Sequence, residues 1–273
     1  MRAAIVQFPH PGAEHNAKHK QPVFPWNTGK HHSKFMRVPA SYMDASGSMV
    51  HAPVSFWGEW EAPSRVIRTW RPEAGLPTYL HEPYWETPQF GGFRQNTDPW
   101  VFGDYFRYSN CKQQSQNALL HLLPGSMVLF GSTRGGQFVL DTCFIAASSA
   151  PMLETQGDDE VFDVCTINSL RHGTSEFQVH RGATVTNPIG GMFSFTPCLA
   201  GGETARFRRP IIELAPYVNP RSQQSPSGAS VLRPTAEIRR AWDLVVEQVR
   251  EEGLDLGVHM ATPPRVLRPR SDE

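Results

Sequence analysis

Apolar residues along the chain fall into short runs separated by proline and glycine, a pattern that predicts strands more often than helices. The run RAAIVQF at residues 2–8 predicts an opening strand. The clearest signal comes from two almost wholly apolar runs, 127–131 and 137–147, which the turn sequence STRGG joins. They predict a β-hairpin that is covered on both faces. A short helix is expected before this hairpin, at 115–123, because a Pro-Gly pair follows it directly.

Further strands and one longer helix follow from the same kinds of pattern. Short strands are expected at SRVIRTW, SEFQVHRG, GMFSFTPC and PIIEL, with glycine-rich and proline-rich turns between them. Near the C-terminus, Ile238, Trp242, Val245 and Val249 recur at helical spacing. This spacing buries one stripe of a helix and predicts a helix over 235–252.

Taken together, the predicted elements and the length of 273 residues indicate one domain rather than two. We expect an α+β fold over 1–260, with a mostly antiparallel, partly closed sheet and peripheral helices. The remaining residues, 261–273, are rich in proline and arginine and are expected to form a flexible tail.

The stretch FWGEWEAPSRV places two tryptophans beside two glutamates. If it is a strand, alternate side chains point to opposite faces, so Trp57, Glu59 and Glu61 share one face. Phe56 and Trp60 then lie on the other face. A tryptophan ring can stack on a base and a carboxylate can accept from an exocyclic amine, so we consider both rings as binding residues and both glutamates as catalytic candidates. The alternative is a half-buried strand whose acids pair with arginines.

A cationic segment without any acidic residue runs from 15 to 43. Its densest part, TGKHHSKF, contributes Lys30, His31, His32 and Lys34. Cations interrupted by aromatic residues are suited to contacts with phosphates, and we predict these four residues as binding residues. The alternative interpretation is a solvated basic loop.

An aromatic region from 71 to 99 has too many rings for a disordered linker, so we expect it to pack on the rest of the fold. In the overlapping stretch TDPWVFGDYFRYSNC, Asp104 is a candidate general base if it lies in a cleft, and the neighbouring Tyr105 is a candidate binding residue. Asp98 directly precedes a proline, which favours a turn.

Charge and composition restrict the partners, the cellular location and the metal sites that we expect. Lysine plus arginine equals aspartate plus glutamate, 26 each, so any attraction to nucleic acid must be local. The chain contains no signal-peptide pattern and no apolar run of about 18 residues, so we expect a cytoplasmic protein without a membrane partner. The four cysteines are isolated, and the spacing of the eleven histidines does not indicate a metal site, so none is assigned.

The run from 112 to 147, with its PGS turn and apolar hairpin, resembles the central unit of PUA-like domains of the EVE and ASCH type. Ser126 stands where those families commonly have aspartate. The resemblance implies a compact, partly closed barrel over about 1–147, with an aromatic insertion at 65–110 and a sheet extension at 150–215. It also implies a nucleotide, often a modified one, as the ligand.

The motifs HPG, KHHSKF, FWGEWE, NTDPWVFGDYFRYSNC and MFSFTPC resemble bacterial and phage nucleotide modification associated domains. Those families are assigned mainly by their proximity to genes of DNA-base modification. The resemblance therefore implies a protein that recognises a nucleotide or nucleic acid in association with DNA or nucleotide modification.

An enzyme that acts at a glycosidic bond is the alternative hypothesis. The E-x-E spacing of Glu59 and Glu61 is similar to that of arginine-specific ADP-ribosyltransferases, and HRGAT and FSFTP loosely resemble their arginine and serine strands. This resemblance implies that Arg181 binds phosphates, although in those enzymes the E-x-E follows the arginine strand, whereas here it precedes it. Two carboxylates on one strand face also suit glycosidases. A ligand-free interaction protein is a further alternative, and the sequence predicts neither a cofactor nor an oligomeric state.

Overall fold

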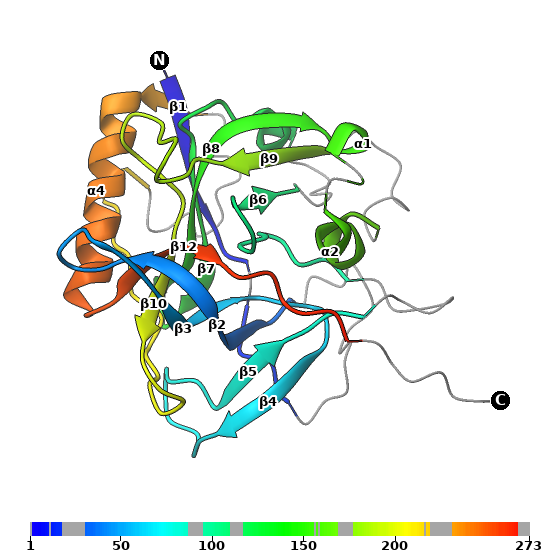
Figure 1. Cartoon of the computed structure of the whole chain (residues 1–273). Coiled ribbons are helices and arrows are strands. Elements are labelled where there is room, and N and C mark those ends of the chain that lie inside the picture. The colour runs from blue at the N-terminus through cyan, green and yellow to red at the C-terminus, as the bar shows by residue number, and fades with distance from the viewer. Residues whose placement is uncertain are drawn as a thin grey trace.

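The computed structural model describes most of the chain, namely residues 2–10, 12–17, 31–86, 95–109, 117–155, 157, 159–168, 177–215, 217–218 and 231–266. The predicted α+β class is confirmed, because two six-stranded sheets are accompanied by helices. Figure 1 shows the long helix α4 (Thr235–Glu251) along one side of the molecule, beside β1 (Arg2–Phe8).

The first sheet contains the predicted hairpin and the predicted opening strand. In it, β1 pairs in parallel with one hairpin strand, and the two hairpin strands pair with each other in antiparallel fashion. The strand order is β11-β1-β7-β8-β9-β6. The bounds of the five strands other than β1 are β11 Leu232–Pro234, β7 Met127–Arg134, β8 Gln137–Pro151, β9 Gln178–Gly182 and β6 Arg107–Tyr108.

The second sheet has the order β12-β10-β3-β2-β5-β4, and β12 pairs with β2 as well as with β10. Each of the two sheets is mixed, since β2 pairs in parallel with β5 here and β1 with β7 in the first sheet. The predicted PUA-like barrel is not confirmed by this topology. The bounds are β12 Asp255–Met260, β10 Thr196–Ala200, β3 Met49–Glu59, β2 Ser33–Met43, β5 Tyr79–Pro83 and β4 Ser64–Thr69.

Strand β2 contradicts the alternative interpretation of the cationic segment as a solvated loop, because it covers Ser33–Met43. Its eleven residues pair with β3 along their whole length, and also with β5 and β12. The first four residues of β2 are all buried, and from Arg37 onward more exposed positions alternate with buried ones, so only the second half shows the period of a half-exposed strand. The cations at 34 and 37 therefore gave the appearance of a surface segment.

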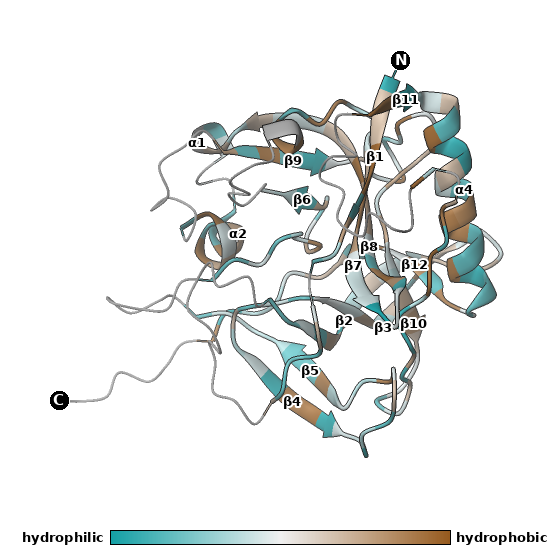
Figure 2. Cartoon of the chain, turned by 180° about the vertical axis from the view of Figure 1, so that it is seen from behind, coloured by the Kyte–Doolittle hydropathy of each residue, from teal (hydrophilic) through white to brown (hydrophobic). Residues whose placement is uncertain are grey.

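Helix α4 is confirmed at the predicted place, and its four spaced apolar residues are all buried. Figure 2 shows the corresponding alternation of hydrophobic and hydrophilic residues along this helix. The helix predicted at 115–123 is only a short 3₁₀ helix, η1 (Asn117–His121), in the described part of that segment. The other helices are α1 (Met152–Thr155), α2 (Glu160–Phe162) and the π-helix η2 (Asp163–Ile167). In the parts of the chain described above, every helix is too short or too polar to cross a membrane.

The first residues of the predicted tail are held by the fold. The backbone N–H of Ala261 donates to Pro39 O at 2.8 Å, and that of Val266 donates to Trp85 O at 2.8 Å. Residues 267–273 lie outside the described residues. These bonds extend the ordered chain beyond the limit predicted at residue 260.

A buried histidine in β9 makes stability depend on pH. Burial lowers the pKa of His180 from 6.5 to about 4, although Nε2 of the ring lies 2.9 Å from Leu119 O, a contact that opposes the shift. The unfolded chain therefore binds a proton at a pH at which the folded chain does not, and stability falls as the pH falls from 6.5 towards 4.

The unfolding free energy of the wild type should fall as the pH is lowered from about 7 to about 4. In His180→Gln this fall should be about 3 kcal/mol smaller, because the buried histidine is absent. Urea unfolding at both pH values measures this difference. The exposed His51 offers a control for the substitution itself, and His51→Gln should change the unfolding free energy at pH 7 by less than about 0.5 kcal/mol. Equal pH dependence in His180→Gln and the wild type would contradict the assignment.

Candidate active site

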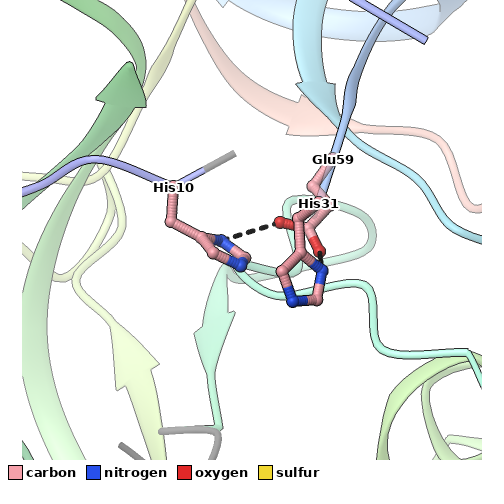
Figure 3. A group of neighbouring side chains, drawn as sticks. All are labelled: His10, His31 and Glu59. Carbon is pink, nitrogen blue, oxygen red and sulfur yellow. Dashed lines mark ion pairs between the residues drawn. The ribbon is translucent and has the colours of Figure 1, made fainter. Parts of the chain in front are cut away.

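A cluster of titratable side chains lies where the two sheets meet. His10 follows β1 of the first sheet, His31 precedes β2 of the second, and Glu59 is the last residue of β3. The pairing of Ser33 with Glu59 places His31 beside the glutamate. His10 Nδ1 lies 2.9 Å from Glu59 Oε2, and His31 Nδ1 lies 3.2 Å from Glu59 Oε1, so the carboxylate points between the two rings (Figure 3). We call these three residues the His–Glu cluster.

Glu61 extends the His–Glu cluster toward the surface. Its Oε1 lies 2.6 Å from His31 Nδ1, and its Oε2 accepts a hydrogen bond from the backbone N–H of Asn96 at 2.7 Å. The backbone N–H of Glu61 donates to Thr97 Oγ1 at 3.1 Å, which fixes the residue from a second side. The side chain of Glu61 is 23% exposed, whereas that of Glu59 is fully buried. Glu61 is therefore the carboxylate of the pair that a ligand can reach.

The charges in the His–Glu cluster depend on each other. Burial alone would raise the pKa of Glu59, but the nearby charges of His10 and His31 outweigh it and lower that pKa. Burial alone would lower the pKa of His31, but Glu59 and Glu61 outweigh it and raise the pKa to about 11. Removing such charges from water costs several kcal/mol for each ion. Groups of this kind are concentrated at functional sites, where their chemistry is used.

His10 has unsatisfied polar atoms in this buried position. Both of its ring nitrogens are buried without a hydrogen-bond partner, and so are both carboxylate oxygens of Glu59. The contact of 2.9 Å between the two residues thus has the distance of a hydrogen bond but not its angles. Most buried polar atoms of folded proteins are hydrogen-bonded, so these orphaned atoms indicate a role other than support of the fold.

The two tryptophans predicted to stack on a base lie inside the protein. Trp57 and Trp60 are 2% and 1% exposed, in two different core clusters. The predicted alternation is therefore correct, but the end of β3 is covered on both faces. The Nε1 of Trp57 donates to Phe207 O and that of Trp60 to Pro63 O, so their polar edges are used as well. Neither ring offers a surface to a bound base.

The predicted phosphate contact of Lys34 is also wrong in this structure. Lys34 is 1% exposed, and its Nζ donates to Ala62 O at 3.0 Å. Burial lowers the pKa of Lys34 well below its usual value, against the opposing charge of Glu61. His32 is partly buried, with its ring 6.2 Å from that of His15. Lys30 lies outside the described residues.

Asp104 is not in the cleft that a general base needs. Its side chain is 95% exposed, and its carboxylate lies 3.8 Å from Nε2 of His259, on β12. It is therefore separate from the His–Glu cluster. Asp104 is therefore not the predicted general base, because its side chain projects into solvent and no cleft in the described part of the chain encloses it.

Two further predicted binding residues, Tyr105 and Arg181, lie together. The guanidinium carbon of Arg181 is 4.9 Å from the centre of the Tyr105 ring, and that of Arg107 is 4.8 Å from the same ring. The pairing of β6 with β9 places the two arginines opposite each other. Arg107 also pairs with Asp159 at 2.8 Å. We call Tyr105, Arg107 and Arg181 the Tyr–Arg group.

His10 was not among the residues predicted from the sequence, where prolines and a glycine follow the opening strand. A histidine in the loop that follows a buried strand is a signal that could have pointed to it. No protein-family model, no curated protein and no solved structure was found to match this chain. Its function is therefore inferred from the geometry of the residues described above.

Proposed function

We propose that the protein is an enzyme that acts on a nucleotide or nucleic acid, with the His–Glu cluster and Glu61 as its active site. One observation carries this proposal, which is the convergence of two histidines and two glutamates from distant segments at one partly accessible point. A fold gains little from burying these groups together, because the desolvation of each ion offsets the attraction between them. Their chemistry is the better explanation of their position.

Glu61 is the general base in this proposal. It is partly exposed, and Asn96, Thr97 and His31 hold its position from different sides. A positioned carboxylate can take a proton from an attacking water molecule or hydroxyl group. Glu59 lies behind it as the buried anion that orients the two histidines. A water molecule or hydroxyl group activated by Glu61 can attack a glycosidic bond, so the proposed reaction is hydrolysis or transfer at such a bond.

A nucleotide as the substrate is supported by two independent observations. The sequence resembles PUA-like domains and nucleotide modification associated domains, and the double pairing of β12 is compatible with a partly closed barrel of the PUA-like type. The Tyr–Arg group also combines a flat ring with two guanidinium groups. Guanidinium groups suit phosphates, and aromatic rings suit bases. We therefore propose a role in DNA or nucleotide modification.

The proposal predicts that Glu61→Gln slows the reaction by about 10²- to 10⁴-fold, the usual contribution of a general base. The purified protein is incubated with nucleosides, nucleotides, NAD⁺ and oligonucleotides with modified bases, and mass spectrometry detects released bases or transferred groups. The matched control is Glu82→Gln, because Glu82 lies on the surface in an ion pair with Arg65.

Three outcomes decide the proposal. Turnover that depends on Glu61 but not on Glu82 supports it. Full turnover by Glu61→Gln contradicts the assigned base. A folded wild-type protein that neither binds nor converts any of these compounds contradicts the proposal as a whole and favours an interaction protein without a small ligand.

A further inference from the structure

We infer that His10, His31 and Glu59 form a binding site for one divalent transition metal ion. The binding of the ion is inferred from the geometry of the cluster alone. The role of the ion in catalysis rests on the function proposed above, because it would lie beside the general base Glu61. The sequence spacing indicated no such site, because its members come from three segments that only the folded chain brings together.

The distances between the donor atoms suit a single ion. One ligand atom from each residue lies within 4.8 Å of the ligand atoms of the other two. Nitrogen and oxygen donors that bind one ion at about 2.0–2.1 Å are themselves roughly 3.0–3.4 Å apart. Glu59 already contacts both rings at similar distances, with Oε2 2.9 Å from His10 Nδ1 and Oε1 3.2 Å from His31 Nδ1. The ligand atoms, which lie within 4.8 Å of one another, would draw closer together around the ion.

The chemistry of the donors selects the class of metal. Two imidazoles and one carboxylate suit zinc, iron and related ions, whereas magnesium and calcium prefer sets made of oxygen alone. Three protein ligands leave open positions for water or substrate, as in catalytic sites. A bound ion would also give a ligand bond to one ring nitrogen of His10 and to the carboxylate of Glu59, which have no hydrogen-bond partner in the described part of the chain.

The surroundings of the cluster fit an outer shell of the site. Glu61 Oε1 lies 2.6 Å from His31 Nδ1, so Glu61 would accept a hydrogen bond from this nitrogen if His31 bound the ion through its other ring nitrogen, Nε2, and Asn96 and Thr97 fix the position of Glu61. Hydrogen bonds of this kind around metal ligands determine how firmly the ligands are held. With an ion held by the cluster, Glu61 would lie close to it and would be the residue able to accept a proton from water there. Glu61 is then the base of the proposed reaction, whereas His10, His31 and Glu59 are the metal ligands.

The rival arrangement is an ion cluster without metal, in which protonated histidines balance the two carboxylates. The untagged full chain is used for the test, because a histidine tag binds the same ions. The protein is treated with a chelator, dialysed against Zn²⁺, Co²⁺, Mn²⁺ or Mg²⁺, and analysed for bound metal. Calorimetric titration with Zn²⁺ and the visible absorption of Co²⁺ report affinity and ligand geometry.

We expect about one Zn²⁺ or Co²⁺ per chain, and a loss of affinity of at least about 10- to 100-fold in His10→Ala and in Glu59→Gln. His10→Gln is the second variant at this position, and circular dichroism establishes that each variant is folded. The matched control is His259→Ala, because His259 is 41% exposed and lies outside the cluster, and its metal binding should equal that of the wild type. Glu61→Gln should keep the metal and lose turnover.

Several results would overturn the metal site. They are less than about 0.1 ion per chain, preference for Mg²⁺ over Zn²⁺, or equal binding by the wild type and the folded His10 variants. Failure of the two proposals is distinguishable. A protein that binds one ion but converts no nucleotide contradicts the proposed function alone, whereas one that converts a nucleotide and binds no ion contradicts the metal site alone.

Discussion

Replacing Arg209 with methionine is expected to lower the free energy of unfolding by about 3–5 kcal/mol, the usual cost of removing one partner of a buried ion pair. Arg209 and Asp141 have side chains that are 2% and 1% exposed, and Nε of the arginine lies 3.0 Å from Oδ1 of the aspartate. Without the guanidinium, the carboxylate keeps only the hydrogen bond that Ser33 Oγ donates at 3.0 Å. The loss comes from an aspartate left buried without its cation.

Other contacts of Arg209 add to this expected loss. Its Nη1 donates to Ser132 Oγ at 2.6 Å and to Gly12 O at 3.0 Å, and its guanidinium carbon lies 4.5 Å from the centre of the Trp57 ring. Burial lowers the pKa of Arg209 to about 10 and raises the pKa of Asp141. Each burial effect is opposed by the charge of the other residue, so each group depends on its partner to stay ionised.

Chemical unfolding of three variants distinguishes the contribution of the ion pair to stability from that of the surrounding contacts. Arg209→Met and Asp141→Asn should each be strongly destabilised, and the double variant Asp141→Leu/Arg209→Met should recover most of the loss, because no unpaired charge remains. The adjacent Arg208 is exposed, so Arg208→Met is the control and should change stability by less than about 0.5 kcal/mol. If Arg209→Met costs no more than Arg208→Met, the pair does not stabilise the fold.

The second large effect is expected at Trp60, where substitution by alanine should cost about 3–5 kcal/mol of unfolding free energy. Its ring centre lies 5.1 Å from that of Phe102 and 6.0 Å from that of Trp100, and its Nε1 donates to Pro63 O at 2.8 Å. Truncation removes this packing and leaves a cavity. We therefore expect the variant to lose stability rather than a contact with a ligand.

Two measurements together test this expectation. Unfolding experiments give the stability of Trp60→Ala, and nucleotide titration is carried out under conditions in which the variant is still folded. Trp70 is only partly buried, so Trp70→Ala is the control and should cost less. A folded, stable Trp60→Ala protein with weakened nucleotide binding would instead favour base stacking by this ring and would require the core to open.

Much of the fold was predictable because it depends on neighbours in sequence. The hairpin of β7 and β8 and the helix α4 follow from apolar spacing and from turn residues, and both are where the pattern places them. Strand β2 was missed because its burial depends on β3, β5 and β12, which are distant in sequence. A local sequence pattern shows how apolar and polar residues alternate along a strand, but it does not show how many distant strands pair with it.

The candidate site was predictable in part for the same reason. Glu59, Glu61 and His31 were selected from motifs, and the fold brings these three together. His10 was missed because its contact with Glu59 joins two different sheets. Trp57 and Lys34 were assigned to the surface because their sequence does not reveal that layers lie on both sides of β2 and β3.

Strand β12 pairs with both β10 and β2, and this has a consequence for the order in which the protein folds during its synthesis. During synthesis the chain emerges from its N-terminus, so β2, which begins two residues after His31, is made long before residues 255–260 exist. Until those last residues arrive, one edge of β2 lacks a partner along Ala40–Met43, and the backbone groups there stay available to other chains. A nascent protein halted before that point would carry both histidines and the glutamate of the cluster, yet it would lack the final strand that joins β2 to β10.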